Sequence, residues 1–223
     1  MRQVLFLCLI AVCGFFISGS VSAQDAEIEE VVVKGKVLQS DQVNALKTPT
    51  PIINVPQSLT IVTDEEMLEK GMRSIGDIIR YTPGVNTSQG EGHRDAVVFR
   101  GVRSTADFFQ DGARDDVQYY RSLYNVEQVE ILRGPNALLF GRGGTGGALN
   151  RVTKKAMVGD DFRSVNVGMD SFGAFDLAAD INVDMGDTMA LRINVHSDTL
   201  ENHRDYYEGD RLGLNPTLRM KLS

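Results

Sequence analysis

The sequence predicts an exported chain with two folded parts: an α/β module, with a mixed sheet and short helices, followed by antiparallel strands of the transmembrane β-barrel type. Three observations lead to this expectation. An apolar run opens the 223-residue chain, strand-like and helix-like segments alternate between Ile52 and about Lys155, and a two-residue alternation of apolar and polar side chains begins near Phe162. The change of period marks the boundary between the two parts.

The first element is an apolar run with the pattern of a secretory signal peptide. Arg2 supplies the positive end, Val4 to Ile17 the apolar stretch, and Val21-Ser22-Ala23 the small-residue stop, so cleavage is expected before Gln24. The run is too short for a stable membrane anchor. It holds both cysteines of the chain, and the exported protein therefore has neither a disulfide framework nor a thiolate metal site.

The charge of the exported chain argues against nucleic acid as a partner. Without Arg2, 22 basic residues face 30 acidic ones, a net charge of −8. A surface that binds phosphates needs an excess of lysine and arginine. No later apolar run approaches the length of a membrane-spanning helix, so any passage through a bilayer would have to use strands.

Residues 24–51 read as a polar, mobile tail with one apolar island. The island is Val31-Val32-Val33, which follows an acidic start. Three β-branched residues suit an extended segment that adds to the exposed sheet edge of a partner. A chance run of valines in a linker is the other interpretation, and composition alone favours it.

The α/β module is expected to contain short elements separated by two long polar loops. Asp64 with two following glutamates is expected to cap the first helix, which ends at Gly71, and the second helix starts at Ser74 and stops at Thr82-Pro83-Gly84. The strands are expected at residues 58–63, 97–99, 108–109, 126–132 and 148–153, and the loops at 86–95 and 113–122. Long loops on a small rigid module are where binding is usually found.

The last part contains four alternating segments of about ten residues each. They cover residues 165–169, 175–184, 189–196 and 212–222, joined by turns at 170–173 and 185–188 and by a longer charged connector from Glu201 to Arg211. One apolar face, one charged or small face, and connectors that alternate between short and long are typical of a transmembrane barrel. A soluble β-sandwich is the alternative.

Catalytic and cofactor motifs are weak. Gly141 to Gly146 fits the dinucleotide pattern G-x-G-x-x-G, but a strand rather than a helix follows, so we interpret these glycines as a tight turn where backbone packs on backbone. His93, His196 and His203 share no metal-ligand spacing, and no G-x-S-x-G elbow is present. We therefore expect neither an enzyme, nor a protein-bound metal, nor a cofactor.

Several motifs together resemble those of TonB-dependent outer-membrane siderophore receptors. The longest runs from Val126 to Gly147 and continues from Asn150 to Lys155, and it resembles the segment near the end of the receptor plug domain. Shorter matches lie at 54–58, 81–85, 99–101 and 111–112, and Glu29 to Gly35 resembles the TonB box, which reverses the interpretation of the valine run as a chance feature.

The resemblance implies a signal peptide (1–23), a periplasmic tail with the TonB box (24–51), a plug domain (52–157) and the first strands of a barrel (158–223) in the cell outer membrane. It implies that TonB binds Glu30, Val31, Val32 and Val33, that outer-membrane lipid surrounds the barrel, and that iron arrives as a siderophore chelate, most similar to the catecholate branch. The implied ligand-binding residues are His93, Arg94, Arg103, Arg114, Tyr119, Tyr120 and Arg121. The implied structural motif of the plug comprises Arg100, Gly101, Asp111, Gly112, Arg133, Gly134, Pro135, Gly141, Gly146 and Gly147.

The length of the last part raises a further question. Residues 162–223 have room for about four strands, whereas the smallest transmembrane barrels use about eight. We expect the chain to be the N-terminal fragment of a transport receptor. The alternative is a truncated, non-transporting protein that at most binds TonB or ligand.

Overall fold

The computed structural model describes residues 42–43, 50–88, 94–104, 107–117, 119–134, 146–201 and 203–221. The expected signal peptide and the valine run lie outside these residues and stay predictions. One correction concerns the tail. β1 (Gln42–Val43) pairs antiparallel with β2 (Thr50–Pro51), and Val43 is buried against Leu132, so these positions belong to the fold rather than to a mobile tail.

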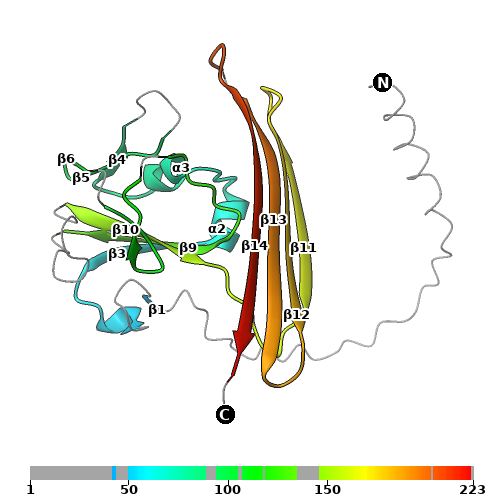
Figure 1. The fold of residues 1–223 in the computed structure, drawn as a ribbon. Helices are drawn as coiled ribbons and strands as arrows, with labels where there is room; N and C mark the ends of the chain where they lie inside the picture. The colour runs from blue at the N-terminus through cyan, green and yellow to red at the C-terminus, as the bar shows by residue number, and fades with distance from the viewer. Residues whose placement is uncertain are drawn as a thin grey trace, which may run out of the picture. The chain divides into compact units, whose positions relative to one another are not determined.

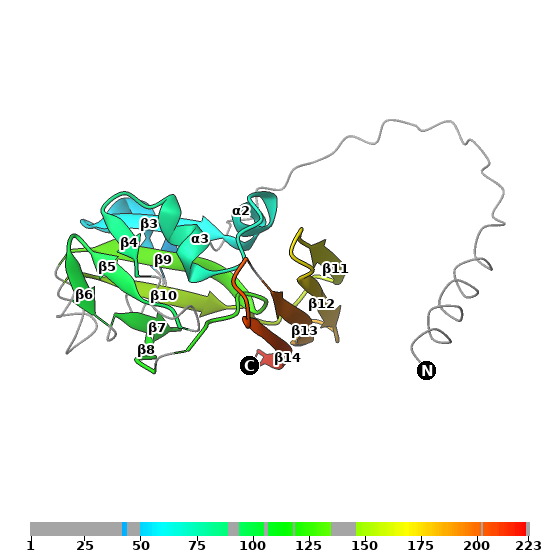
Figure 2. The same ribbon diagram turned by 90° about the horizontal axis from the view of Figure 1, so that it is seen from above.

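A five-stranded mixed sheet organises the α/β module, with the order β3-β9-β10-β7-β8 (Figures 1 and 2). Its strands are β3 (Ser58–Thr63), β9 (Val126–Arg133), β10 (Gly147–Thr153), β7 (Phe108–Gln110) and β8 (Ala113–Arg114). The pair β10–β7 is parallel, and the other neighbours are antiparallel. A second sheet contains β4 (Val85–Thr87), β5 (Val97–Phe99) and β6 (Val102–Ser104). The prediction of a mixed sheet is confirmed.

Two short helices follow β3, and each begins at a hydroxyl cap. The cap of α2 (Asp64–Glu69) is Thr63, whose Oγ1 accepts from the Glu66 amide, so the expected cap at Asp64 was wrong by one residue. The cap of α3 (Ile75–Arg80) is Ser74, which forms a capping box with Asp77. A short 3₁₀ turn, η2 (Ile52–Asn54), precedes β3. No helix among the described residues is long and apolar enough to cross a bilayer.

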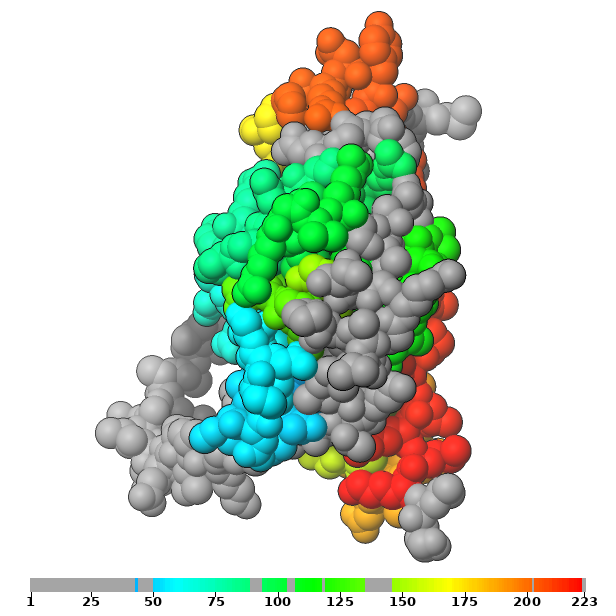
Figure 3. All heavy atoms as spheres, turned by 90° about the vertical axis from the view of Figure 1, so that its left-hand side faces the viewer, coloured from blue at the N-terminus to red at the C-terminus, as the bar shows by residue number. Residues whose placement is uncertain are grey.

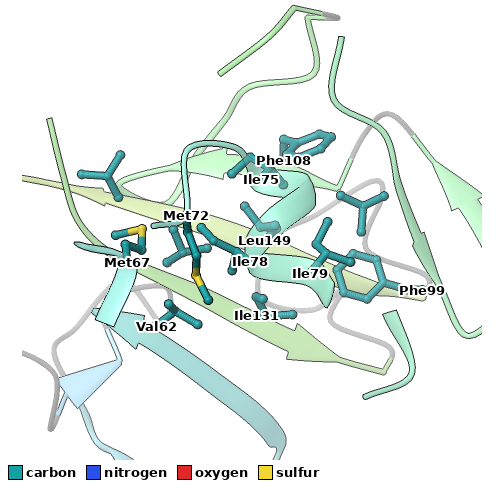
Figure 4. Close-up of a cluster of buried hydrophobic side chains, with 13 residues drawn as sticks. Val62, Met67, Met72, Ile75, Ile78, Ile79, Phe99, Phe108, Ile131 and Leu149 are labelled. Atoms are coloured by element: carbon teal, nitrogen blue, oxygen red, sulfur yellow. The ribbon is translucent and has the colours of Figure 1, made fainter. Parts of the chain in front are cut away.

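The core of the module lies between these helices and the five-stranded sheet (Figure 4). Ile75, Ile78 and Ile79 of α3 point toward Leu149 and Ile131 of the sheet. The spacing of these isoleucines places them on one helical face, and all three are buried. Burial of this apolar face holds α3 on the sheet, because a helix this short is not stable alone.

The third part is a sheet of four antiparallel strands in sequential order, called here the wall. Its strands are β11 (Phe162–Met169), β12 (Phe175–Asp184), β13 (Met189–Glu201) and β14 (Glu208–Met220). Register places Val165, Ala179, Val195 and Leu214 in one row of an apolar outer face. The alternate rows contain polar residues such as Asp180 and Asn194 and form the inner face, where these two side chains are buried.

The connectors of the wall differ from the prediction in one place. The expected connector from Glu201 to Arg211 is shorter than predicted, because β13 runs to Glu201 and β14 already begins at Glu208. Arg211 lies within β14 and pairs across the ladder with Asp198, which extends both strands beyond the apolar rows. The β13–β14 connector and the β12–β13 turn lie at opposite ends of the molecule (Figure 3).

Candidate functional site

Two hairpin turns of the α/β module have the same backbone conformation. Arg100 and Gly101 have φ values of 47° and 86°, and Asp111 and Gly112 have values of 49° and 77°. Positive φ at both central positions defines the type I′ turn, which favours an aspartate or glycine. The Asp111 carboxylate also accepts hydrogen bonds from the amide and hydroxyl of Thr153, at 3.0 and 2.6 Å. These contacts fix the β7–β8 hairpin to the end of β10.

A buried polar chain supports the same hairpin from inside. The Gly112 amide donates to Asn150 Oδ1 (2.9 Å), Asn150 Nδ2 donates to Glu130 Oε2 (3.0 Å), and Gln128 Nε2 donates to Glu130 Oε1 (2.8 Å). Glu130 and Asn150 have no exposed surface. A buried carboxylate of this kind needs such donors, since burial without them is strongly unfavourable.

The remaining residues of the structural motif join distant parts of the module. Arg133 donates to the Pro83 carbonyl (3.0 Å) and to Thr60 Oγ1 (3.0 Å), which connects β9 with β3 and with the end of α3. Gly134 follows at φ 111°. Gly146 and Gly147 lie against Phe99 so closely that neither has room for a Cβ atom, which agrees with close backbone packing. Pro135 and Gly141 lie outside the described residues.

Among the expected ligand-binding residues that the structure describes, Arg121 is the most completely buried, with 1% of its surface exposed. Its guanidinium donates to Asp115 Oδ2 (3.1 Å) and to the carbonyls of Asp115 (2.9 Å), Val117 (2.7 Å) and Tyr119 (3.2 Å). It also lies 3.8 Å from the centre of the Phe108 ring. The geometry gives Arg121 a structural role: it ties the 115–119 loop to the sheet instead of facing outward.

Asp95 and Tyr119 are neighbours in this cluster. Asp95 Oδ2 accepts from the Arg121 amide at 2.8 Å. Burial raises the pKa of Asp95, and the hydrogen bond and charge of Arg121 offset part of that rise. The Tyr119 hydroxyl donates to Asp115 Oδ2 (2.7 Å) and accepts from Arg151 (2.9 Å). Its ring, 37% exposed, forms part of the outer surface of the cluster.

A hollow of about 230 Å³ lies where the module meets the β13–β14 connector. Two of the predicted ligand-binding residues, Arg94 and Tyr120, line it. Burial raises the pKa of Tyr120, so its hydroxyl is protonated at neutral pH. Arg80 of α3 adds a further cation, and the connector contributes residues that sequence reasoning did not assign: His203, Arg204 and Tyr207. Sequence reasoning could have found these three residues, because charged and aromatic types occur together in one connector.

The other predicted ligand-binding residues that the structure describes do not line this hollow. Arg103 is exposed on β6, and Arg114 lies over the Phe109 ring at 5.8 Å; neither lines the hollow. His93 lies outside the described residues. No group of three His, Cys, Asp or Glu residues that could hold a metal ion occurs in the described part of the chain.

Comparison with known proteins agrees with this architecture. The family model described as TonB-dependent Receptor Plug Domain matches residues 51–148. The chain is 28% identical to "Probable TonB-dependent receptor BfrD" of Bordetella pertussis over 96% of its own length and 30% of that protein. It is also 28% identical to the catecholate siderophore receptor Fiu of Escherichia coli K12, over 79% of this chain and 24% of Fiu.

Solved structures give the same result. The open form of the ferric-catecholate import receptor Fiu from E. coli K12 superposes with a TM-score of 0.69 at 26% identity, covering 75% of this chain and 25% of Fiu. The siderophore receptor PiuA from Acinetobacter baumannii superposes with a TM-score of 0.72 at 26% identity, covering 81% and 27% of the two chains. The present chain thus spans 24–30% of the length of these relatives.

The fold and these matches define a plug domain followed directly by antiparallel strands. Residues 51–148 match the plug domain of TonB-dependent receptors, and the described fold resembles the N-terminal part of the siderophore receptors Fiu and PiuA. The resemblance expected from the sequence is confirmed. The family consists of receptors and transporters rather than enzymes.

Proposed function

We propose that this chain is the plug-bearing part of an outer-membrane receptor that takes up a ferric siderophore of the catecholate class and is driven by TonB. The observation that carries the proposal is the hollow between plug and wall, where Arg80, Arg94 and Arg204 accompany two tyrosines. The family match and the names of the relatives support the same activity.

The apolar outer face of the wall supports a position in the membrane. Large side chains on this face are strongly exposed, for example Leu212 (83%), Met169 (78%) and Leu214 (67%). An exposed apolar surface of this kind needs a partner, and alternation with a polar inner face suits lipid on one side only. Outer-membrane lipid is the partner that we propose for it.

The charges around the hollow support an anionic ligand. Its two carboxylates already have partners within the plug, because Asp77 belongs to the Ser74 capping box and Asp95 accepts from the Arg121 amide. Arginines and tyrosine rings can bind a flat, negatively charged chelate through ion pairs and stacking. A ferric catecholate combines both properties.

TonB dependence can be tested at the valine run. Strand addition needs backbone N–H groups, so Val32→Pro should abolish pairing with TonB. We expect at least tenfold slower uptake of ⁵⁵Fe as a tris-catecholate in cells that rely on the gene encoding this chain, with chelate binding to their outer membranes unchanged. Val37→Pro, outside the run, is the control and should transport normally. Equal uptake by both variants would refute TonB dependence at this segment.

The ligand class can be tested at the hollow. Because each arginine can supply a charge-assisted hydrogen bond, Arg94→Ala combined with Arg204→Ala should weaken binding of a ferric tris-catecholate by about tenfold or more. Intrinsic fluorescence quenching on purified protein measures the affinity. Arg103→Ala removes an exposed arginine elsewhere on the plug and should leave it unchanged. An equally strong interaction with a neutral ferric hydroxamate would exclude the catecholate assignment.

A further inference from the structure

The inner face of the wall holds the plug through a buried group of charges. Arg192 of β13 donates to both carboxylate oxygens of Asp180 on β12, at 2.8 and 2.7 Å. Its remaining nitrogen donates to Glu127 Oε2 (3.0 Å) and to the Lys155 carbonyl (3.2 Å), both in the plug. Lys154 of the plug completes the group by donating to Asp180 Oδ2 at 2.9 Å.

Within this group, Glu127 adds specificity more than stability. Arg192 has only 3% of its surface exposed. Burial raises the pKa of Glu127, and the charge of Arg192 only partly offsets the rise. The Glu127 carboxylate therefore loses more by leaving water than it gains from its partner, which is common for buried ion pairs. Such a pair adds an energetic cost to any arrangement that separates Glu127 from Arg192.

A second contact beside these charges depends on shape. The Tyr124 ring of the plug stacks on His196 of β13, with 5.1 Å between ring centres and 7° between planes. Gly213 is the cross-strand neighbour of His196 on β14. A Cβ atom on Gly213 would lie 2.6 to 2.8 Å from three atoms at the tip of the Tyr124 ring. The absence of a side chain at residue 213 thus forms a notch that the ring fills.

We propose that β12–β14 form a specific docking site, called here the seat, for the plug of the same chain. The seat consists of Arg192 with Asp180 and of the notch at Gly213. The occupant is the plug segment 124–127 together with Lys154 and Lys155. Charge and shape act together: the seat binds a plug that presents a flat ring beside a carboxylate, and it does not bind a plug that lacks these two groups. No residue of the seat lines the ligand hollow, so the seat does not depend on the identity of the siderophore.

Asn194 offers a reporter of seat occupancy. It lies between Arg192 and His196 on the inner face of β13, is fully buried, and neither polar atom of its side chain has a hydrogen-bond partner. Asn194→Cys therefore removes no hydrogen bond. It would be the only cysteine in residues 24–223, because Cys8 and Cys13 both lie in residues 1–23. Its rate of reaction with a maleimide reports how often the plug leaves the seat.

The test fills the notch in purified full-length protein that carries the reporter. Gly213→Leu should accelerate maleimide labelling at least tenfold, because the new side chain occupies the position of the ring. Gly209→Leu is the matched control on the same face of β14, where the nearest atom to a new Cβ is 3.8 Å away, and it should change the rate less than twofold. Adding Tyr124→Ala to Gly213→Leu should return labelling to within about threefold of the parent.

The rescue separates a lost seat from a misfolded wall, since removing a plug side chain cannot repair the wall. Rapid labelling that Tyr124→Ala does not reverse would overturn the proposal, and so would an unchanged rate in Gly213→Leu. Arg192→Ala should also accelerate labelling at least tenfold, whereas Arg219→Ala, an exposed arginine of β14, should not. Siderophore affinity is expected to stay within twofold in the Gly213 variant. The labelling rate therefore tests the seat and siderophore affinity tests the proposed function, so that failure of one can be told from failure of the other.

Discussion

Arg121→Ala is expected to lower the free energy of unfolding of the plug by about 3–5 kcal/mol, the range for removing one partner of a buried ion pair. The substitution leaves Asp95 buried without its nearest cation and removes the donors that bind three loop carbonyls. It also removes the group that packs on the Phe108 ring. The cost combines an uncompensated charge, unsatisfied acceptors and lost packing.

Urea unfolding of the purified protein, followed by circular dichroism, measures this change. Arg114→Ala is the matched control, because Arg114 also lies over a phenylalanine ring but is only half-buried. We expect its effect to stay below about 1 kcal/mol. If Arg121→Ala were no more destabilising than Arg114→Ala, and instead abolished chelate binding, Arg121 would contact ligand as the sequence pattern implied.

Gly147→Val is expected to destabilise the plug by about 3 kcal/mol or more, at the upper end for overpacking. Even the first added carbon would lie 2.4 Å from Phe99 Cδ1 and 2.6 Å from the Leu132 carbonyl oxygen. The ring could rotate away, but the carbonyl belongs to β9 and pairs within the central sheet. Relief of the second clash would therefore need a shift of the strand itself.

Thermal unfolding monitored by circular dichroism would show this as a fall in Tm of roughly 10 °C or more. Gly76→Ala provides the control inside the same domain. Gly76 lies in α3, the nearest atom to an added Cβ is at 3.4 Å, and alanine favours the helix, so the change should be neutral or slightly stabilising. A Tm for Gly147→Val close to that of the parent would show that the β5–β10 contact is looser than these distances imply.

Local signals in the sequence predicted much of the architecture. Two-residue alternation predicted β12 with its observed bounds, and Ser74 and the Asp111-Gly112 pair predicted a helix start and a hairpin turn. Each of these features depends on neighbouring residues alone. The parallel pairing of β10 with β7 depends on residues about 40 positions apart, and no local pattern contains it.

The candidate site was less predictable for the same reason. Arginine and tyrosine in one loop suggested a common role, yet Arg121 is buried because Asp95, 26 positions earlier, lies beneath it. Whether an arginine faces a ligand or a buried carboxylate depends on tertiary packing. Similarly, β13 and β14 extend past their apolar rows because Arg211 and Asp198 pair across the ladder, which hydrophobic alternation alone does not reveal.

The connection between plug and wall has a consequence for how strongly the two must bind. Only residues 154–161 separate β10 from β11, so the plug cannot diffuse away from the wall. A tether this short maintains an effective local concentration on the order of millimolar. Contacts that would be too weak to hold two separate proteins together are then sufficient to keep the plug docked. A modest change in those contacts, of about 1.4 kcal/mol, would still shift the docked-to-released ratio tenfold.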